Sequence, residues 1–167
     1  LFHFRELNDR DGESEVLEAI GNVEYKSGDL FKAESILLSS LQIKNEIDIR
    51  PQSKSYVLGC LGQIAYEQFE YPKAESYFQQ ALNIAKQHGF KRLESYRLND
   101  LGNLYMSFYQ DYEKAQEYYQ KSIDLKLEND DIAGTAATIL NLGIIMCEQG
   151  KYPEAKAYYE ESLEIFK

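Results

Sequence analysis

The chain has 167 residues, of which 44% are hydrophobic and 28% charged, a composition that suits a globular domain or a short repeat array and excludes intrinsic disorder. Its 28 acidic and 18 basic residues give a net charge of −10, and no basic run exceeds Lys91-Arg92, so we expect no nucleic-acid partner. The longest apolar-rich stretch, 136–147, is interrupted by polar residues and is shorter than the roughly 18 residues of a membrane helix, so we expect no membrane partner.

Residues 1–12 are interpreted as the end of a preceding repeat's second helix and the linker after it. The linker interpretation depends on the similarity of residues 8–12 (NDRDG) to residues 130–134 (DDIAG). The sequence has no initiator Met, and it stops in a second helix without a polar capping helix. We therefore expect the chain to be a fragment of a longer protein.

Residues 13–167 contain four similar units. Four glycines recur at intervals of 41, 40 and 41 residues, namely Gly21, Gly62, Gly102 and Gly143. Four alanines recur at the same 40- to 41-residue spacing, namely Ala33, Ala74, Ala115 and Ala155. The third unit has one extra residue between its glycine and its alanine, near 109–111. The spacing predicts four units at about 14–50, 51–91, 92–132 and 133–167.

Each unit is predicted to be a helical hairpin. Apolar residues lie four before, one before and two after each glycine, and again four and eight after each alanine, which is the spacing of two helices with one buried face each. Gly28 and Gly150 suit the turn between the helices, and Pro72 and Pro153 suit the first turn of the second helix. Four small residues of the second helices are predicted to pack against the next repeat, namely Ser40, Ala81, Ser122 and Ser162.

The unit resembles the tetratricopeptide repeat. The resemblance is carried by Leu-Gly at 61–62, 101–102 and 142–143, then by Tyr-Pro-Lys-Ala at 71–74 or Tyr-Pro-Glu-Ala at 152–155, and then by an aromatic residue four positions later. The 40- to 41-residue period and the absence of a closing Pro resemble the long-repeat branch. That branch is found in kinesin light chains, Pins-type adaptors, bacterial peptide-sensing regulators and the sensor arrays of signalling ATPases. The resemblance implies an all-α fold, a right-handed α-solenoid of antiparallel helical hairpins.

In such arrays the first helix of each hairpin lines the concave groove. The side of that helix about 40° to 140° around from the repeat glycine is largely polar and aromatic in the first three units. We predict that this side binds an extended peptide through Asn22, Gln63, Asn99, Asn103, Tyr25, Tyr56, Tyr66, Tyr96, Lys26, Glu18 and Glu67.

Three of these residues form a row of amides, each directly after a repeat glycine: Asn22, Gln63 and Asn103. A side-chain amide offers both a donor and an acceptor to a peptide bond. The resemblance implies a ladder that holds the ligand backbone. The alternative is that these amides only face water or cap neighbouring turns. Because Ile144 interrupts the row, a ligand should engage mainly the first three units.

The charged residues of the groove indicate which ligand charge it favours. Glu15, Glu18, Glu67 and Glu148 are opposed there by Lys26 alone, which favours a neutral or basic peptide. A carboxylate clamp would need Lys or Arg in the first and third units, where the sequence has Glu18, Tyr96 and Asn99. Acidic chaperone tails are therefore disfavoured as partners.

Catalysis, metal binding and a cofactor are not expected. His3 and His88 have no cysteine or serine placed near them by the repeat, and the carboxylates are spread along solvated helix faces. Cys60 and Cys147 lie 87 residues apart in unrelated surroundings, which is typical of reduced structural thiols.

The sequence thus predicts a non-enzymatic protein-interaction module that binds a protein or peptide ligand in its groove. The alternative function is a ligand-sensing regulatory domain of a transcriptional regulator or signalling ATPase. We expect a cytoplasmic location. We also expect weak self-association through the uncapped ends, with the apolar residues Leu1, Phe2, Phe4, Leu163, Ile165 and Phe166.

Overall fold

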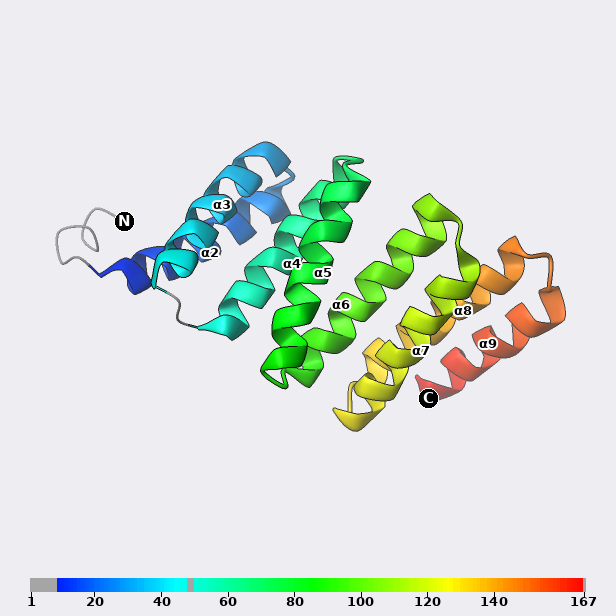
Figure 1. The fold of residues 1–167 in the computed structure, drawn as a ribbon. Coiled ribbons are helices and arrows are strands. Elements are labelled where there is room, and N and C mark those ends of the chain that lie inside the picture. Colours follow the sequence, from blue (N-terminus) through cyan, green and yellow to red (C-terminus); the bar gives the residue numbers. More distant parts are fainter. Residues whose placement is uncertain (1–8, 48–49, 167) are drawn as a thin grey trace. The chain divides into compact units, whose positions relative to one another are not determined.

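The computed structural model describes residues 9–47 and 50–166, and within them it is all-helical, without a strand (Figure 1). This confirms the predicted all-α fold. The elements are α2 (Arg10–Ser27), α3 (Leu30–Ile47), α4 (Pro51–Glu67), α5 (Tyr71–Gln87), α6 (Lys91–Leu104), the π-helical turn η1 (Tyr105–Tyr109), α7 (Tyr112–Glu128), α8 (Ile132–Glu148) and α9 (Tyr152–Ile165).

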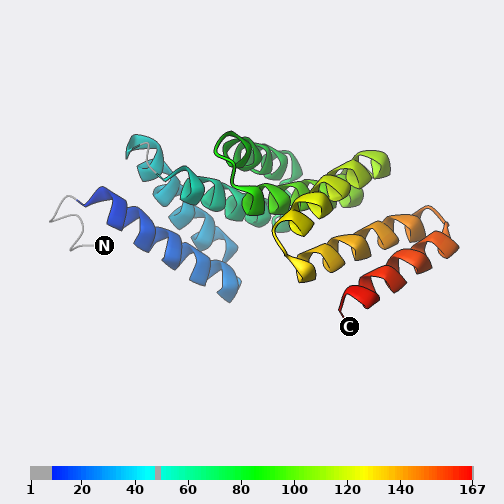
Figure 2. The same ribbon diagram turned by 90° about the horizontal axis from the view of Figure 1, so that it is seen from below.

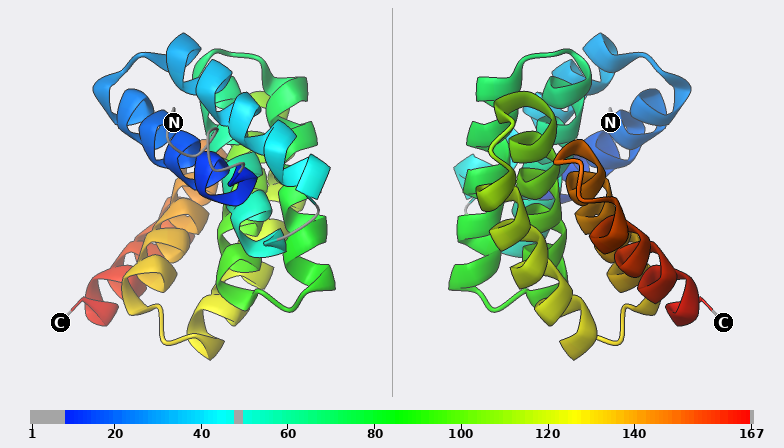
Figure 3. Two further views of the ribbon diagram at one scale, coloured as in Figure 1. Left: turned by 90° about the vertical axis from the view of Figure 1, so that its left-hand side faces the viewer. Right: turned by 90° about the vertical axis from the view of Figure 1, so that its right-hand side faces the viewer.

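The chain divides into two compact units, Leu1–His88 and Gly89–Lys167. In the first unit α2 pairs with α3, and α4 with α5, as antiparallel hairpins (Figure 2). In the second unit α6 with η1 pairs with α7, and α8 pairs with α9 (Figure 3). The predicted half-repeat lies mostly outside the described residues, since 1–8 are not among them. Its last residues, 10–12, belong to the first turn of α2, because the Asp9 side chain caps that helix at the Gly12 N–H, 2.8 Å away.

The repeat glycines allow the two helices of each hairpin to approach closely. A Cβ atom at Gly62 would lie 2.5 Å from two ring atoms of Phe78, far inside van der Waals contact. The other glycines meet the equivalent side chain of their own hairpin, at 2.5 to 2.7 Å. The pairs are Gly21 with Leu37, Gly62 with Phe78, Gly102 with Tyr119, and Gly143 with Tyr159. A bulky side chain of the second helix thus occupies the space that a Cβ would need.

The turns inside the hairpins all contain a residue of positive φ. Gly28 (φ 90°) and Gly150 (φ 71°) have it as predicted, and Phe69 (φ 64°) and Gln110 (φ 53°) adopt it in the second and third hairpins. The two prolines that were predicted to open second helices lie in the first turns of α5 and α9, namely Pro72 and Pro153. The predicted turns and helix starts are confirmed.

The extra residue of the third repeat is accommodated by η1. After Leu104 the α-helix widens into the π-helical turn, and Gln110 then adopts a left-handed conformation. The N–H of Asp111 donates to the carbonyl of Tyr105 at 3.0 Å, which closes the wide turn. A π-helical turn adds one residue to a helix, so the two helices on either side keep their repeat register.

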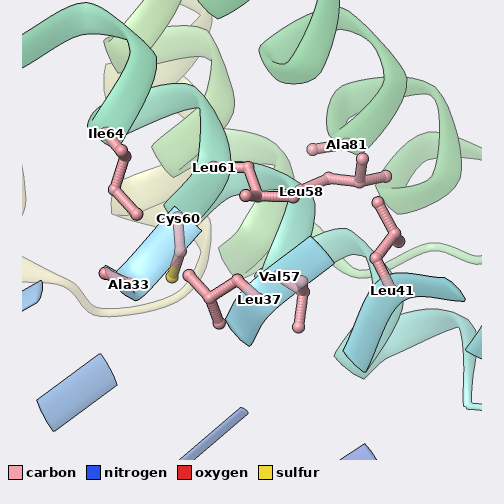
Figure 4. Close-up of a cluster of buried hydrophobic side chains, with 9 residues drawn as sticks. All are labelled: Ala33, Leu37, Leu41, Val57, Leu58, Cys60, Leu61, Ile64 and Ala81. Carbon is pink, nitrogen blue, oxygen red and sulfur yellow. The ribbon is translucent and has the colours of Figure 1, made fainter. Parts of the chain in front are cut away.

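Each unit has its own apolar core. The core of the first unit consists of Ala33, Leu37, Leu41, Val57, Leu58, Cys60, Leu61, Ile64 and Ala81 (Figure 4). The core of the second consists of Tyr105, Ala115, Tyr119, Ile123, Ile139, Leu142, Ile145, Met146 and Ala155. Both cysteines are free thiols, and only Cys60 is buried. Of the helices that the structure describes, none is long and apolar enough to cross a bilayer.

Buried serine hydroxyls also join the two helices of each hairpin. Three of them donate to a first-helix carbonyl at 2.7 to 2.8 Å: Ser40 to Ser14, Ser122 to Ser95, and Ser162 to Ala136. In the second hairpin the direction is reversed, because Ser55 of α4 donates to the carbonyl of Ala81 at 2.8 Å. These hydrogen bonds lie within one hairpin each, and close packing of the four small residues against the next repeat stays a prediction.

Ser122→Ala should lower the free energy of unfolding by about 1 kcal/mol, because it removes the buried hydrogen bond that the Ser95 carbonyl of α6 accepts from α7. Urea unfolding followed by circular dichroism measures the change. Ser39→Ala is the control, since Ser39 is exposed and its hydroxyl bonds only within its own helix, to the carbonyl of Ser35. Equal effects of the two substitutions would show that the hydrogen bond between the helices does not matter.

Candidate functional site

The first unit presents the predicted binding residues on α2 and α4. We call this set the first-unit surface; it consists of Glu18, Asn22, Tyr25 and Lys26 on α2, and Tyr56, Gln63, Tyr66 and Glu67 on α4. Lys26, Tyr56 and Glu67 are exposed, and the other five are partly buried. The surface is therefore accessible along both helices, and its two amides are less exposed than Lys26 and Glu67.

Several of these residues are partners of one another or of the neighbouring helix. The Tyr25 hydroxyl donates to the Glu67 carboxylate at 2.5 Å, and the Ser53 hydroxyl donates to the Glu18 carboxylate at 2.6 Å. Both bonds join α2 to α4. Side chains predicted to contact a ligand thus also hold the two first helices together, which fixes the geometry of the surface.

Sequence reasoning missed Lys44, which reaches the surface from α3. Its ammonium lies 3.2 Å from the Glu18 carboxylate and donates to the Ser14 hydroxyl at 3.1 Å, and its side chain is 1% exposed. Arg50 likewise forms an ion pair with Glu15. Arg50 also pairs with Asp11 at 2.7 Å, so the count of four glutamates against one lysine omitted two cations and one carboxylate, and the charge beside the first-unit surface is less negative than the sequence indicated.

Two amides of the first-unit surface have unused hydrogen-bonding groups. Asn22 and Gln63 are partly buried, and their side chains form no hydrogen bond with any residue that the structure describes. Each is the residue after a repeat glycine, so they occupy the same place on α2 and α4. Their donors and acceptors are available to a ligand.

The second unit presents Tyr96, Asn99 and Asn103 on α6, and their side chains are partly buried. Here the amide oxygens are used internally. The Asn99 oxygen accepts from the Thr138 hydroxyl at 3.0 Å. The Asn103 oxygen accepts from the Tyr119 hydroxyl at 2.7 Å and from the Asn141 amide at 3.3 Å. The second-unit amides are thus held in place by α7 and α8.

Lys126 is a second buried lysine at the repeat position of Lys44. Its ammonium donates to the Thr138 hydroxyl at 2.6 Å and to the Gly134 carbonyl at 3.2 Å, and it lies 5.8 Å from the centre of the Tyr96 ring. Burial lowers the pKa of Lys126 below its ordinary value, against the opposing charges of Asp131 and Asp100. Lys126 thus links α7 to the Thr138 hydroxyl that bonds Asn99.

Lys126 should make stability depend on pH. Because its folded-state pKa is lowered, the unfolded chain binds more protons, and the free energy of unfolding rises as the pH approaches the ordinary lysine pKa of 10.5. Relative to Lys126→Met, the wild type should therefore gain stability as the pH is raised toward that value. Chemical denaturation at a series of pH values measures the difference. The control is Lys121→Met, at a side chain that is 60% exposed; a difference for Lys126→Met that stays constant with pH would contradict this account.

The three amides of the predicted row fall in both units, Asn22 and Gln63 in the first and Asn103 in the second. A continuous ladder through all three stays a prediction. Within the described ranges, no three His, Cys, Asp or Glu side chains gather as metal ligands do. His88 is exposed, and His3 lies outside the described residues.

Comparison with known proteins identifies the repeat. The tetratricopeptide repeat family model matches residues 12–87, 52–128 and 92–167. No protein with a curated description matches the chain.

Among solved structures, BtubC (BKLC) from P. vanneervenii is 20% identical with a TM-score of 0.84, covering 93% of this chain and 64% of that one. A Rap protein complexed with competence and sporulation factor is 18% identical with a TM-score of 0.82, covering 92% and 42%. A signal transduction ATPase with numerous domains and a tetratricopeptide repeat sensor, from Pyrococcus horikoshii, is 25% identical with a TM-score of 0.84, covering 97% and 25%.

The chain spans less than two thirds of the length of each of these proteins. The likeness to the first two shows the fold alone. The family matches together run from residue 12 to residue 167 and follow the repeat glycines and hairpins described above. The chain belongs to the tetratricopeptide repeat family.

Proposed function

We propose that the chain is a protein-interaction module that binds an extended segment of a partner protein along its first helices. One observation carries the proposal. Asn22 and Gln63 occupy the same repeat position on neighbouring first helices, are partly buried, and have no side-chain hydrogen bond to the described residues. The repeat fold supports it as well, since this fold typically belongs to non-enzymatic interaction modules and to regulatory repeat domains.

The chemistry of the amides favours a peptide backbone as ligand. Each amide can donate to a carbonyl and accept from an N–H, the two groups that every residue of an extended peptide offers. Partly buried Tyr25 and Tyr66 lie on the same helices and add aromatic contact area. Such a surface holds a segment with little regard to its sequence, and the tyrosines supply the preference for particular side chains.

The charge balance narrows the ligand class. Glu18 is paired with Lys44, and Glu15 with Arg50, which leaves Glu67 and Lys26 as the exposed charges of the first-unit surface. These two charges balance, so the surface itself favours a neutral segment, and the net charge of −10 of the chain favours a weakly basic segment over an acidic tail.

Selection from a peptide library, followed by titration against alanine variants, tests the proposal. Asn22→Ala and Gln63→Ala should each weaken binding by about 1–3 kcal/mol without changing the circular dichroism spectrum, because a ligand group loses its partner. Gln79→Ala is the matched control, since Gln79 is an exposed amide on α5 whose partner is Asn83 of the same helix. Selected peptides that are indifferent to Asn22 and Gln63 would overturn the proposal.

A regulatory function is the second candidate. It is favoured by the 25% identity to a signalling ATPase that carries a tetratricopeptide repeat sensor, over 97% of this chain. In a sensor, ligand binding should change how the two units are arranged. Spin labels at the exposed sites Ser39→Cys and Lys156→Cys, one in each unit of a chain with both native cysteines replaced, would report this as a shift in their distance on adding a selected peptide. An unchanged distance would favour the simple interaction module.

We also propose weak self-association through α9. Leu163 is 57% exposed, whereas the equivalent residues of the earlier second helices are only 2–9% exposed: Leu41, Leu82 and Ile123. Neighbouring Phe166 is 61% exposed.

A second copy of the chain that covers this face should give a concentration-dependent sedimentation coefficient near 100 μM, in the roughly micromolar-to-millimolar range of weak contacts. Leu163→Glu should abolish the dependence; a wild-type monomer at that concentration would disprove it. The N-terminal residues Leu1, Phe2 and Phe4 lie outside the described residues.

A further inference from the structure

We infer that Tyr119 is a positioning residue that makes Asn103 a hydrogen-bond donor only, so that the third repeat recognises a carbonyl or another acceptor of the ligand and not an N–H. The inference rests on the proposed function. It specifies which kind of ligand atom the Asn103 amide binds. Tyr119 is completely buried in α7, and the tip of its side chain reaches the amide on α6.

Two donors converge on the amide oxygen of Asn103. The Tyr119 hydroxyl donates to it at 2.7 Å, and the Asn141 side chain donates to it from α8 at 3.3 Å. Turning the Asn103 amide around would aim its NH₂ group at the Asn141 NH₂ group and would leave the Tyr119 hydroxyl with the Met106 sulfur, 3.8 Å away, as its acceptor. Because a thioether sulfur accepts a hydrogen bond more weakly than an amide oxygen, the oxygen stays turned inward. The NH₂ group, which has no partner among the described residues, is what a ligand meets.

The other repeats lack this arrangement. The residues equivalent to Tyr119 are Leu37 in the first repeat and Phe78 in the second, and neither has a hydroxyl to orient Asn22 or Gln63. In the fourth repeat Tyr159 has the hydroxyl, but it lies 3.5 Å from the Cys147 sulfur, and the amide position is Ile144. Asn22 and Gln63 can therefore either donate or accept, and Asn103 is the one amide of the row whose role is fixed.

Phe78 also shows that the hydroxyl is not needed for packing. Its ring lies against Gly62 as the Tyr119 ring lies against Gly102, with the nearest ring atoms 2.5 Å from a Cβ position in both hairpins. Tyr119→Phe should therefore preserve the hairpin and remove only the hydrogen bond. This separates an effect on Asn103 from an effect on folding.

Titration of a peptide selected on the wild type tests the inference. Tyr119→Phe should weaken binding roughly five-fold, and Asn103→Ala more strongly. In the Asn103→Ala background, Tyr119→Phe should have no further effect, a coupling that a merely structural role would not produce. Asn103→Asp should bind as weakly as Asn103→Ala, because a carboxylate can accept from Tyr119 and Asn141 but offers no donor to the ligand.

The outcomes separate the inference from the proposed function. If Asn103→Ala weakens binding but Tyr119→Phe does not, or if Asn103→Asp binds like the wild type, the positioning role is wrong and the interaction surface stands. If Asn103→Ala binds normally while Asn22→Ala and Gln63→Ala bind weakly, the inference again fails and the function stands. If none of the three alanine variants affects binding, the proposed function itself fails.

Discussion

Gly62→Ala is expected to lower the free energy of unfolding by about 1–3 kcal/mol, even though alanine is by about 1 kcal/mol the better helix former. The reason is steric, since the new Cβ would lie 2.5 Å from the Cδ1 and Cε1 atoms of the buried Phe78 ring. The ring is 2% exposed and is enclosed by its hairpin, so it cannot move aside without cost. Urea denaturation of the two proteins measures the change.

In the Phe78→Ala background, the effect of Gly62→Ala on the free energy of unfolding should change sign. Phe78→Ala alone should cost about 3–5 kcal/mol through the cavity that it leaves. In that cavity the methyl group of Gly62→Ala has room, so the same substitution should now be neutral or stabilising by up to about 1 kcal/mol. Stabilisation by Gly62→Ala in the wild-type background would show that the close approach of α4 and α5 is not what the glycine provides.

Lys44→Ala is expected to cost about 3 kcal/mol or more. The substitution removes the cation that pairs with Glu18 and leaves a void where the buried lysine stem packed. Glu18 would keep the Ser53 hydroxyl as a donor but would lose its opposite charge. Because Glu18 also lies on the first-unit surface, we expect weaker binding of a selected peptide as well as lower stability.

Lys44→Met separates the contribution of the ion pair with Glu18 from that of the packed lysine stem. It keeps most of the apolar stem and removes the charge, so its cost should lie clearly below that of Lys44→Ala. Lys86→Ala, at an exposed lysine of α5, is the control and should change the free energy of unfolding by less than about 0.5 kcal/mol. If Lys44→Ala were as mild as Lys86→Ala, the ion pair with Glu18 would not contribute to the fold.

The hairpins could be predicted from the sequence because their signals are local and repeated. The apolar spacing around Gly21 or Gly62 defines a helix with one buried face, and Gly28 and Pro72 mark where helices end and begin. The position of the extra residue in the third repeat was also evident, although its form was not. Nothing in residues 105–109 distinguishes a π-helical turn from a longer loop.

The hydrogen bonds of the site could not be predicted in the same way. Helical periodicity locates a Cβ, whereas the functional end of a long side chain lies several bonds away and can reach a neighbouring helix. Lys44 and Lys126 therefore contact first helices from positions that were assigned to second helices. Comparison of the repeats offers one signal, since both lysines stand three residues after a core position, at Leu41 and Ile123. The bond of Tyr119 to Asn103 has no such signal.

Nuclear magnetic resonance of the side-chain amides, with a peptide selected from a library, tests the central claim most directly. We expect saturable shifts in the NH₂ signals of Asn22, Gln63 and Asn103, with no shift for Gln79, an exposed residue that donates to Asn83 on α5. Shifts at Gln79 with unchanged signals from the three first-helix amides would place the ligand on another surface and contradict the proposed function.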